Sequence, residues 1–157
     1  MTNAERLERK VDEVKKLLIE EKPPEKFGKK DFVYSFFGAL VVGLTFMFKG
    51  LLIQSGINLS WRNVAMIVIV TLFILTMEIY LIGYSRVKNK EKRPFGQFWA
   101  KRLLTIYLIA IFVSSLLAYL YGIHELAVTN ESFIKIIFAV SLPCAIGASF
   151  TDLLKRY

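Results

Sequence analysis

Glu78 is the residue of this sequence best placed to carry chemistry, because it is a single acidic side chain inside an apolar stretch that runs from residue 63 to 85. A carboxylate surrounded by hydrocarbon is unfavourable unless it is protonated, paired with a cation or in contact with water. One interpretation is therefore that Glu78 binds an ion or a proton. The other is that it forms a structural ion pair with Arg102.

Three further charged residues, Lys101, Arg102 and Asp152, are expected near Glu78. If residues 63–85 and 98–122 form antiparallel helices, Arg102 lies about four residues from one end and Glu78 about seven residues from the same end. The difference corresponds to about 4.5 Å of helix rise, which a guanidinium group spans. We therefore predict a charge cluster of these four residues, which acts either in transport or gating or as a structural element.

A second notable segment contains Pro143 and Gly147 within the apolar stretch 133–154. A proline inside a helix lacks the backbone N–H, so the carbonyl of Ala139 loses its usual partner and the helix is expected to kink near the middle. Freed carbonyls at such breaks line ion sites in transporters. Alternatively, neighbouring helices and serine side chains satisfy the backbone, and the proline is merely tolerated.

Other kinds of site are not indicated by the sequence. Cys144 is the single cysteine and His124 the single histidine, so no metal site is predicted. Without a glycine-rich phosphate loop, paired catalytic carboxylates or a serine, histidine and aspartate arrangement, we expect neither an enzyme nor a cofactor. The formal net charge is +8, but the basic residues flank apolar stretches, so nucleic-acid binding is not expected.

Four apolar stretches of about 20 residues must position these side chains. They cover approximately residues 32–55, 63–85, 98–122 and 133–154, and 55% of the chain is hydrophobic against 22% charged. A helix of that length crosses a hydrocarbon core of about 30 Å. The sequence therefore predicts an all-α membrane protein whose domain, residues 31–157, has four transmembrane helices in two antiparallel hairpins.

The basic residues predict the orientation of these spans. Of the 21 lysines and arginines, 18 lie in the segments that would share one side of the membrane, and only Lys49, Arg62 and Lys135 lie on the other side. Cytoplasmic segments carry the excess of positive charge. We expect a protein of the cell membrane with both termini in the cytoplasm.

The amino-terminal arm, residues 1–22, is predicted to form an amphipathic cytoplasmic helix. Leu7, Val11, Val14 and Leu18 recur at intervals of three and four residues, which places them on one seam. A basic linker that contains two prolines follows at residues 23–30. The seam is expected either to join protomers of an oligomer or to dock on the membrane or on the protein itself.

Two phrases of the sequence, Leu75-Thr76-Met77-Glu78-Ile79 and the segment from Leu142 to Ser149, resemble recurring blocks of a known family. It is a family of integral membrane proteins of archaea and bacteria, catalogued as a domain of unknown function. The resemblance covers about residues 32–154. It implies a prokaryotic bundle of membrane helices and supplies no activity.

Two functional hypotheses follow from these features. The first is a role in ion permeation or gating that involves Glu78 and Arg102, with a small cation as a partner besides the lipid bilayer. Four helices barely surround a pathway of their own, so a pore is expected between protomers of a homo-oligomer. The second is a non-conducting membrane scaffold whose amino-terminal helix recruits a cytoplasmic partner.

Overall fold

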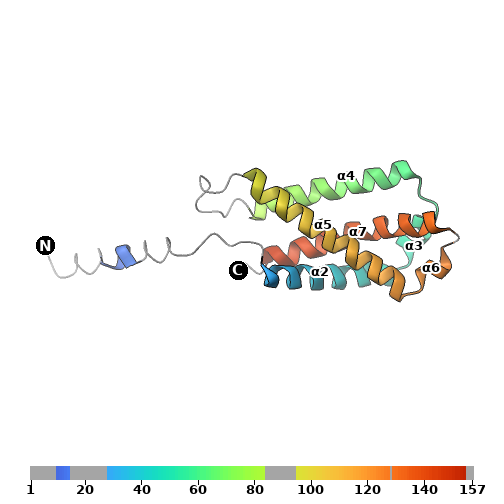
Figure 1. The fold of residues 1–157 in the computed structure, drawn as a ribbon, viewed down its shortest axis with the longest axis horizontal. Coiled ribbons are helices and arrows are strands. Elements are labelled where there is room, and N and C mark those ends of the chain that lie inside the picture. The colour runs from blue at the N-terminus through green and yellow to red at the C-terminus, as the bar shows by residue number, and fades with distance from the viewer. Residues whose placement is uncertain (1–9, 15–27, 84–94, 128, 155–157) are drawn as a thin grey trace.

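The computed structural model describes residues 10–14, 28–83, 95–127 and 129–154, and every regular element among them is a helix (Figure 1). Residues 10–14 are helical as well. The elements that follow them are α2 (Lys29–Phe48), α3 (Leu51–Ile57), α4 (Trp61–Glu78), the π-helix η1 (Ile79–Gly83), α5 (Phe95–Leu120), α6 (Ile123–Leu126) and α7 (Asn130–Leu154).

Four of these helices are long and apolar enough to cross a membrane. The crossing segments are Lys29–Phe48, Trp61–Leu81, Trp99–Leu120 and Asn130–Thr151, with 20 to 22 residues each. At about 1.5 Å per residue, each matches a hydrocarbon core of about 30 Å. The prediction of an all-α fold with four membrane-spanning helices is therefore confirmed.

The first predicted span, residues 32–55, is divided into two helices. α2 ends at Phe48, and Gly50 adopts a left-handed backbone conformation with φ of 67° before α3 begins at Leu51. Glycine has no Cβ, so it takes this conformation without the steric penalty that other residues carry. α3 then packs on α7, where Gly56 lies directly against Ile136.

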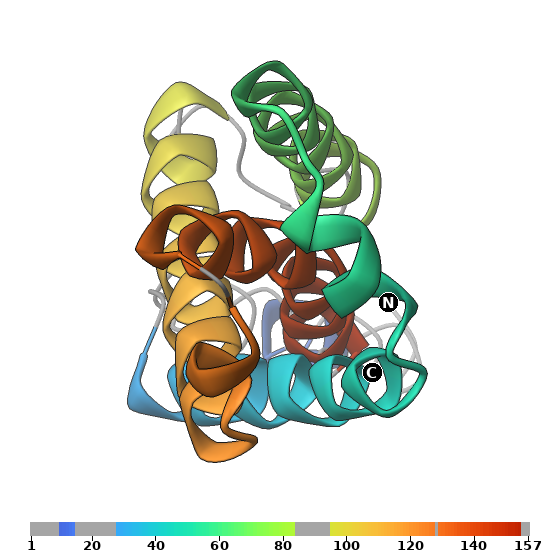
Figure 2. The ribbon, with the colours of Figure 1, turned by 90° about the vertical axis from the view of Figure 1, so that its right-hand side faces the viewer.

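α7 is the central helix of the bundle (Figure 2). It packs against α2, α4, α5 and α3, and 56% of its membrane segment is buried, compared with 22–39% for the other three segments. Small side chains make this position possible, because Cys144, Ala145 and Ala148 are fully buried and let neighbouring helices approach closely.

The arrangement in two packed hairpins is not confirmed. α2 packs chiefly against α7 and then α5, whereas α4 packs chiefly against α7. The physical reason is a close contact of small residues, since Gly38 of α2 meets Gly147 and Thr151 of α7. α4 and α5 meet near η1 and diverge towards the other end of the bundle (Figure 1).

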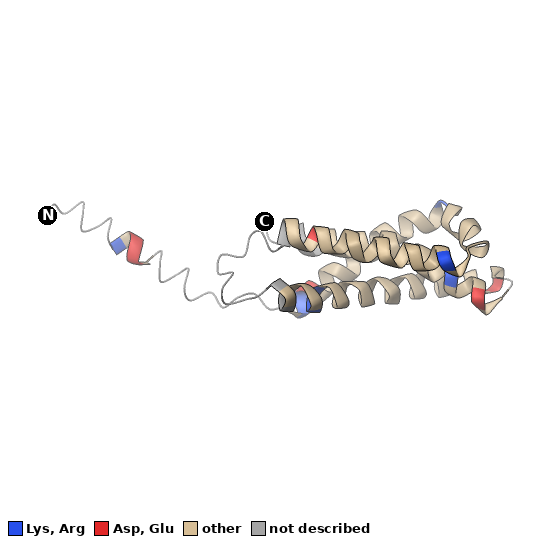
Figure 3. Cartoon of the chain, turned by 90° about the horizontal axis from the view of Figure 1, so that it is seen from above, with Lys and Arg blue, Asp and Glu red and all other residues tan. Residues whose placement is uncertain are grey.

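Large apolar side chains cover the outside of the bundle. This arrangement suits contact with lipid, because a soluble protein rarely exposes apolar surface on this scale. Charged residues gather near the two ends and leave the middle uncharged in the described parts of the chain (Figure 3). The outward-facing residues include Met66, Ile69, Phe73, Leu104, Leu108 and Phe112, each 57–62% exposed.

The amino-terminal arm is described only at residues 10–14, where Val11 and Val14 are about half exposed. Leu7, Leu18 and most of the linker 23–30 lie outside the described residues. The amphipathic helix over residues 1–22 therefore stays a prediction.

Candidate intramembrane polar site

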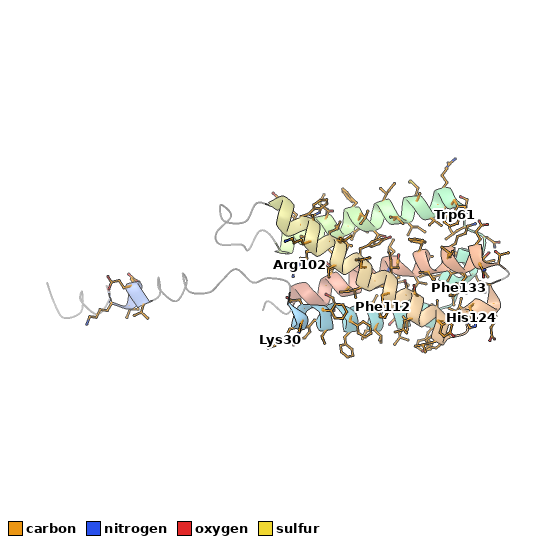
Figure 4. The ribbon with its side chains drawn as sticks, in the orientation of Figure 1. Lys30, Trp61, Arg102, Phe112, His124 and Phe133 are labelled. Carbon is orange, nitrogen blue, oxygen red and sulfur yellow. The ribbon has the colours of Figure 1, made fainter. Side chains whose placement is uncertain are left out.

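The bundle has two ends, which we name by residues labelled in Figure 4. At the Lys30 end, α2 and α5 begin and η1 and α7 finish; at the His124 end, α4 and α7 begin (Figure 4). Glu78 is the last residue of α4 and immediately precedes η1, so it lies towards the Lys30 end. A π-helical turn inside a longer helix is frequently found at a functional site.

The face of α4 that carries Glu78 is turned towards α7. Thr71 and Leu75 precede Glu78 by seven and three residues, which places the three on one helical face. Thr71 is 1% exposed and Leu75 is fully buried. Because α7 is the main neighbour of α4, this face forms the α4–α7 contact.

The carboxyl group of Glu78 faces the hydroxyl of Ser149 on α7. Neither Oε2 of Glu78 nor Oγ of Ser149 makes a hydrogen bond of normal geometry, although both atoms are buried. Buried polar atoms are almost always hydrogen-bonded, and leaving one unsatisfied is unfavourable. This pair is therefore able to take up a proton, a water molecule or a cation between the two helices.

Arg102 lies on α5, is only 4% exposed and interacts with another part of the chain. The ion pairs formed between described residues do not include one between Arg102 and Glu78. The indole Nε1 of Trp99 donates a hydrogen bond of 3.0 Å to Oγ1 of Thr76, so these two residues lie at one level. Arg102 lies three residues further towards the His124 end than Trp99, and Glu78 lies two residues closer to the Lys30 end than Thr76. Arg102 and Glu78 are therefore separated by about 7.5 Å along the axis.

This geometry differs from the estimate based on the sequence. Sequence reasoning placed Glu78 deeper than Arg102, whereas the structure places Arg102 deeper. The reason is that α4 and η1 continue well past the level of Thr76, while α5 begins only four residues before Trp99. The assumption that the apolar stretch 63–85 ends at the depth where the stretch 98–122 begins was therefore incorrect.

The other two residues of the predicted cluster are placed differently from Arg102. Lys101 is exposed, because consecutive residues of a helix point about 100° apart and its neighbour is buried. Asp152 lies in α7, three residues after Ser149, and its side chain lies outside the described part. The cluster of four charges therefore stays a prediction.

A second polar pair lies further from the Lys30 end, and sequence reasoning missed it. The hydroxyl of Tyr107 on α5 is buried without a hydrogen bond and faces Ser141 on α7. Oγ of Ser141 donates to the carbonyl of Phe138 at 2.8 Å. The only available signal was a tyrosine in the middle of a span, away from the membrane interfaces where this residue usually lies.

Pro143 and Gly147 are both buried in α7. α7 is helical on both sides of Pro143. Gly147 packs against the backbone carbonyl of Gly38, and its own carbonyl accepts a hydrogen bond of 2.8 Å from Oγ1 of Thr151. The described contacts therefore give Gly147 a role in close helix packing.

Comparison with known proteins agrees with this architecture. The family model described as "Putative integral membrane protein (DUF2391)", a domain of unknown function, matches residues 4–154. The chain belongs to this family. No curated protein and no solved structure matches it.

Membership of the family establishes an integral membrane protein and leaves its activity to be inferred from the site. At the His124 end, the imidazole of His124 stacks on Tyr119 and lies edge-on to Phe133. Within the residues that the structure describes, no three His, Cys, Asp or Glu side chains gather to hold a metal ion. The polar atoms around Glu78 and Tyr107 are thus the candidate site in the membrane interior.

Proposed function

We propose that this integral membrane protein has a role in ion permeation or gating in which Glu78 binds the ion or proton. The observation that carries the proposal is the buried Oε2 of Glu78, which makes no hydrogen bond of normal geometry and faces the hydroxyl of Ser149, which makes none either. A carboxyl group in a membrane interior is a functional candidate by default. The proposal assigns the protein no enzymatic role.

The proposal places the Lys30 end and both termini in the cytoplasm of a cell whose plasma membrane holds the protein. The excess of lysines and arginines in the segments of that end supports this orientation. Glu78 then lies in the cytoplasmic half of the bilayer. Because α7 fills the centre of the bundle, a pathway runs along the surface of α7 or between protomers of an oligomer.

The test is ion flux through purified protein in liposomes between about pH 5 and 8, a range that changes the availability of protons. Glu78→Gln is compared with the wild type and with Glu125→Gln, which removes an exposed carboxyl at the His124 end. We expect Glu78→Gln to reduce the flux or abolish its pH dependence, and Glu125→Gln to leave both unchanged. Equal flux in all three proteins would refute a role for Glu78.

A second candidate is a non-conducting scaffold that binds a cytoplasmic partner through its amino-terminal helix. It is favoured by the exposure of Val11 and Val14, two apolar residues of the predicted seam. This candidate predicts no flux from correctly folded protein. It also predicts that deletion of residues 1–22 leaves the membrane bundle intact and removes binding of the partner.

A further inference from the structure

We propose that the ion bound by Glu78 is a proton, and that it moves along α7 between the Glu78–Ser149 pair and the Tyr107–Ser141 pair through buried water. This inference rests on the proposed function and specifies its ion and its route. Three buried atoms carry it: Oε2 of Glu78, Oγ of Ser149 and the hydroxyl of Tyr107.

These three atoms make no hydrogen bond of normal geometry although they are buried between helices of a membrane protein. Such atoms are usually satisfied by internal water, which typically makes about three hydrogen bonds to buried polar groups. Hydrocarbon outside the bundle offers no further partner, so we infer that water inside the bundle completes these hydrogen bonds. Ser149 is fully buried, which shows that any such water would lie inside the protein and not at its surface.

The two pairs lie on one stripe of α7. Ser141, Ala145 and Ser149 recur at intervals of four residues and are all fully buried. Eight residues of helix separate the serines by about 12 Å. With oxygen atoms about 2.8 Å apart along a chain of O–H···O bonds, about three water molecules bridge that distance.

A proton suits this arrangement better than a metal cation. A metal cation needs several oxygen ligands at one point, whereas the described side chains offer one carboxyl and one hydroxyl at one level and two hydroxyls about 12 Å away. A proton needs one acceptor at each step. On the carboxylate of Glu78 it also forms a neutral group, which hydrocarbon surroundings tolerate.

Three charged residues lie near the route. Arg102 lies on α5 five residues from Tyr107, about 7.5 Å along the axis and between the levels of the two pairs. Lys101 is exposed, and Asp152 is three residues from Ser149 with a side chain outside the described part.

The transfer balances at each group. Tyr107 accepts a proton on its oxygen from the water on one side and gives its own hydroxyl proton to the acceptor on the other side. Glu78 takes up one proton as a carboxylate and releases it as a carboxylic acid. No bond other than O–H forms or breaks, and no oxidant or reductant takes part.

The experiment uses the full chain in liposomes, with separate dyes inside for pH, Na⁺ and K⁺. Wild type, Glu78→Gln, Tyr107→Phe and Tyr119→Phe are compared. Tyr119 is a matched control, because it lies on the same helix but is 67% exposed. We expect proton flux that depends on Glu78, a decrease of about tenfold or more in Tyr107→Phe, and no change in Tyr119→Phe.

Thermal unfolding of each variant separates a functional loss from a folding defect. The hydroxyl of Tyr107 makes no hydrogen bond of normal geometry to another protein group, so Tyr107→Phe is expected to lower the free energy of unfolding by no more than the loss of one hydrogen bond does and to stay folded. Proton flux that needs Glu78 but persists in Tyr107→Phe would overturn the route.

The remaining outcomes distinguish this inference from the proposed function. Flux of Na⁺ or K⁺ that needs Glu78 would overturn the assignment of the proton and leave the proposed function standing. Flux that is absent, or equal in wild type and Glu78→Gln, would overturn both when the proteins are folded.

Discussion

Gly38→Ala is the substitution that tests the packing of the bundle most directly. Gly38 lies on α2 where this helix crosses α7, and a methyl group added there would overlap the backbone carbonyl of Gly147 and Oγ1 of Thr151. The Cβ of Thr151 would also be only 2.7 Å away. A backbone carbonyl cannot rotate away as a side chain does, so the two helices must move apart.

The expected magnitude is a difference between two effects. Overpacking a tight contact costs about 1–3 kcal/mol, and the backbone conflict places Gly38 at the upper end of this range. Alanine in place of glycine inside a helix stabilises by about 0.5–1 kcal/mol. We therefore expect Gly38→Ala to lower the free energy of unfolding by about 2 kcal/mol.

Gly96→Ala is the matched control, because an added Cβ at this exposed position of α5 meets nothing within 4 Å. It keeps the helix-propensity gain without the overlap, so a stabilisation of about 0.5–1 kcal/mol is expected. The assay is unfolding by sodium dodecyl sulfate in mixed micelles, followed by circular dichroism. If Gly38→Ala is as stable as Gly96→Ala, α2 and α7 do not approach each other as described.

Two further predictions concern the attachment of α4 at its two ends. Trp99→Phe removes the hydrogen bond to Thr76 and should destabilise the protein by about 0.5–1.5 kcal/mol, measured in the same unfolding assay; an unchanged stability would argue against that bond. Lys135 forms an ion pair with Glu131 and its ammonium group lies 5.4 Å from the ring centre of Trp61. Lys135→Met should cost about 1 kcal/mol, and a double-mutant cycle with Trp61→Leu should show coupling between the two side chains.

Much of the fold was predictable because a membrane imposes simple rules on a sequence. Four apolar stretches of the correct length indicated four spanning helices, and the structure has four helices that are long and apolar enough to cross a membrane. The break in the first span was less visible. Gly50 was the available signal, but a glycine inside an apolar stretch does not by itself reveal a positive φ.

The candidate site was predictable only in part. Glu78 stood out because a single carboxyl in an apolar stretch is unusual. Its neighbour Ser149 was not identified, and neither was Tyr107, since hydroxyl groups are common in membrane helices and their burial depends on which helices touch. The depth of Arg102 relative to Glu78 was also misjudged, because sequence spacing gives distances along one helix but not the offset between two.

The sequence by itself determined that this protein is helical, how many times it crosses a membrane and that Glu78 is exceptional, because hydrocarbon selects apolar helices of fixed length whatever their neighbours are. Only the tertiary structure decided that α7 is central and that α2 packs chiefly on α7. The same structure decided which hydroxyl faces Glu78. Lipid solvates every apolar helix equally well, so helix pairing depends on local fit between surfaces such as those of Gly38 and Gly147, which hydropathy does not encode.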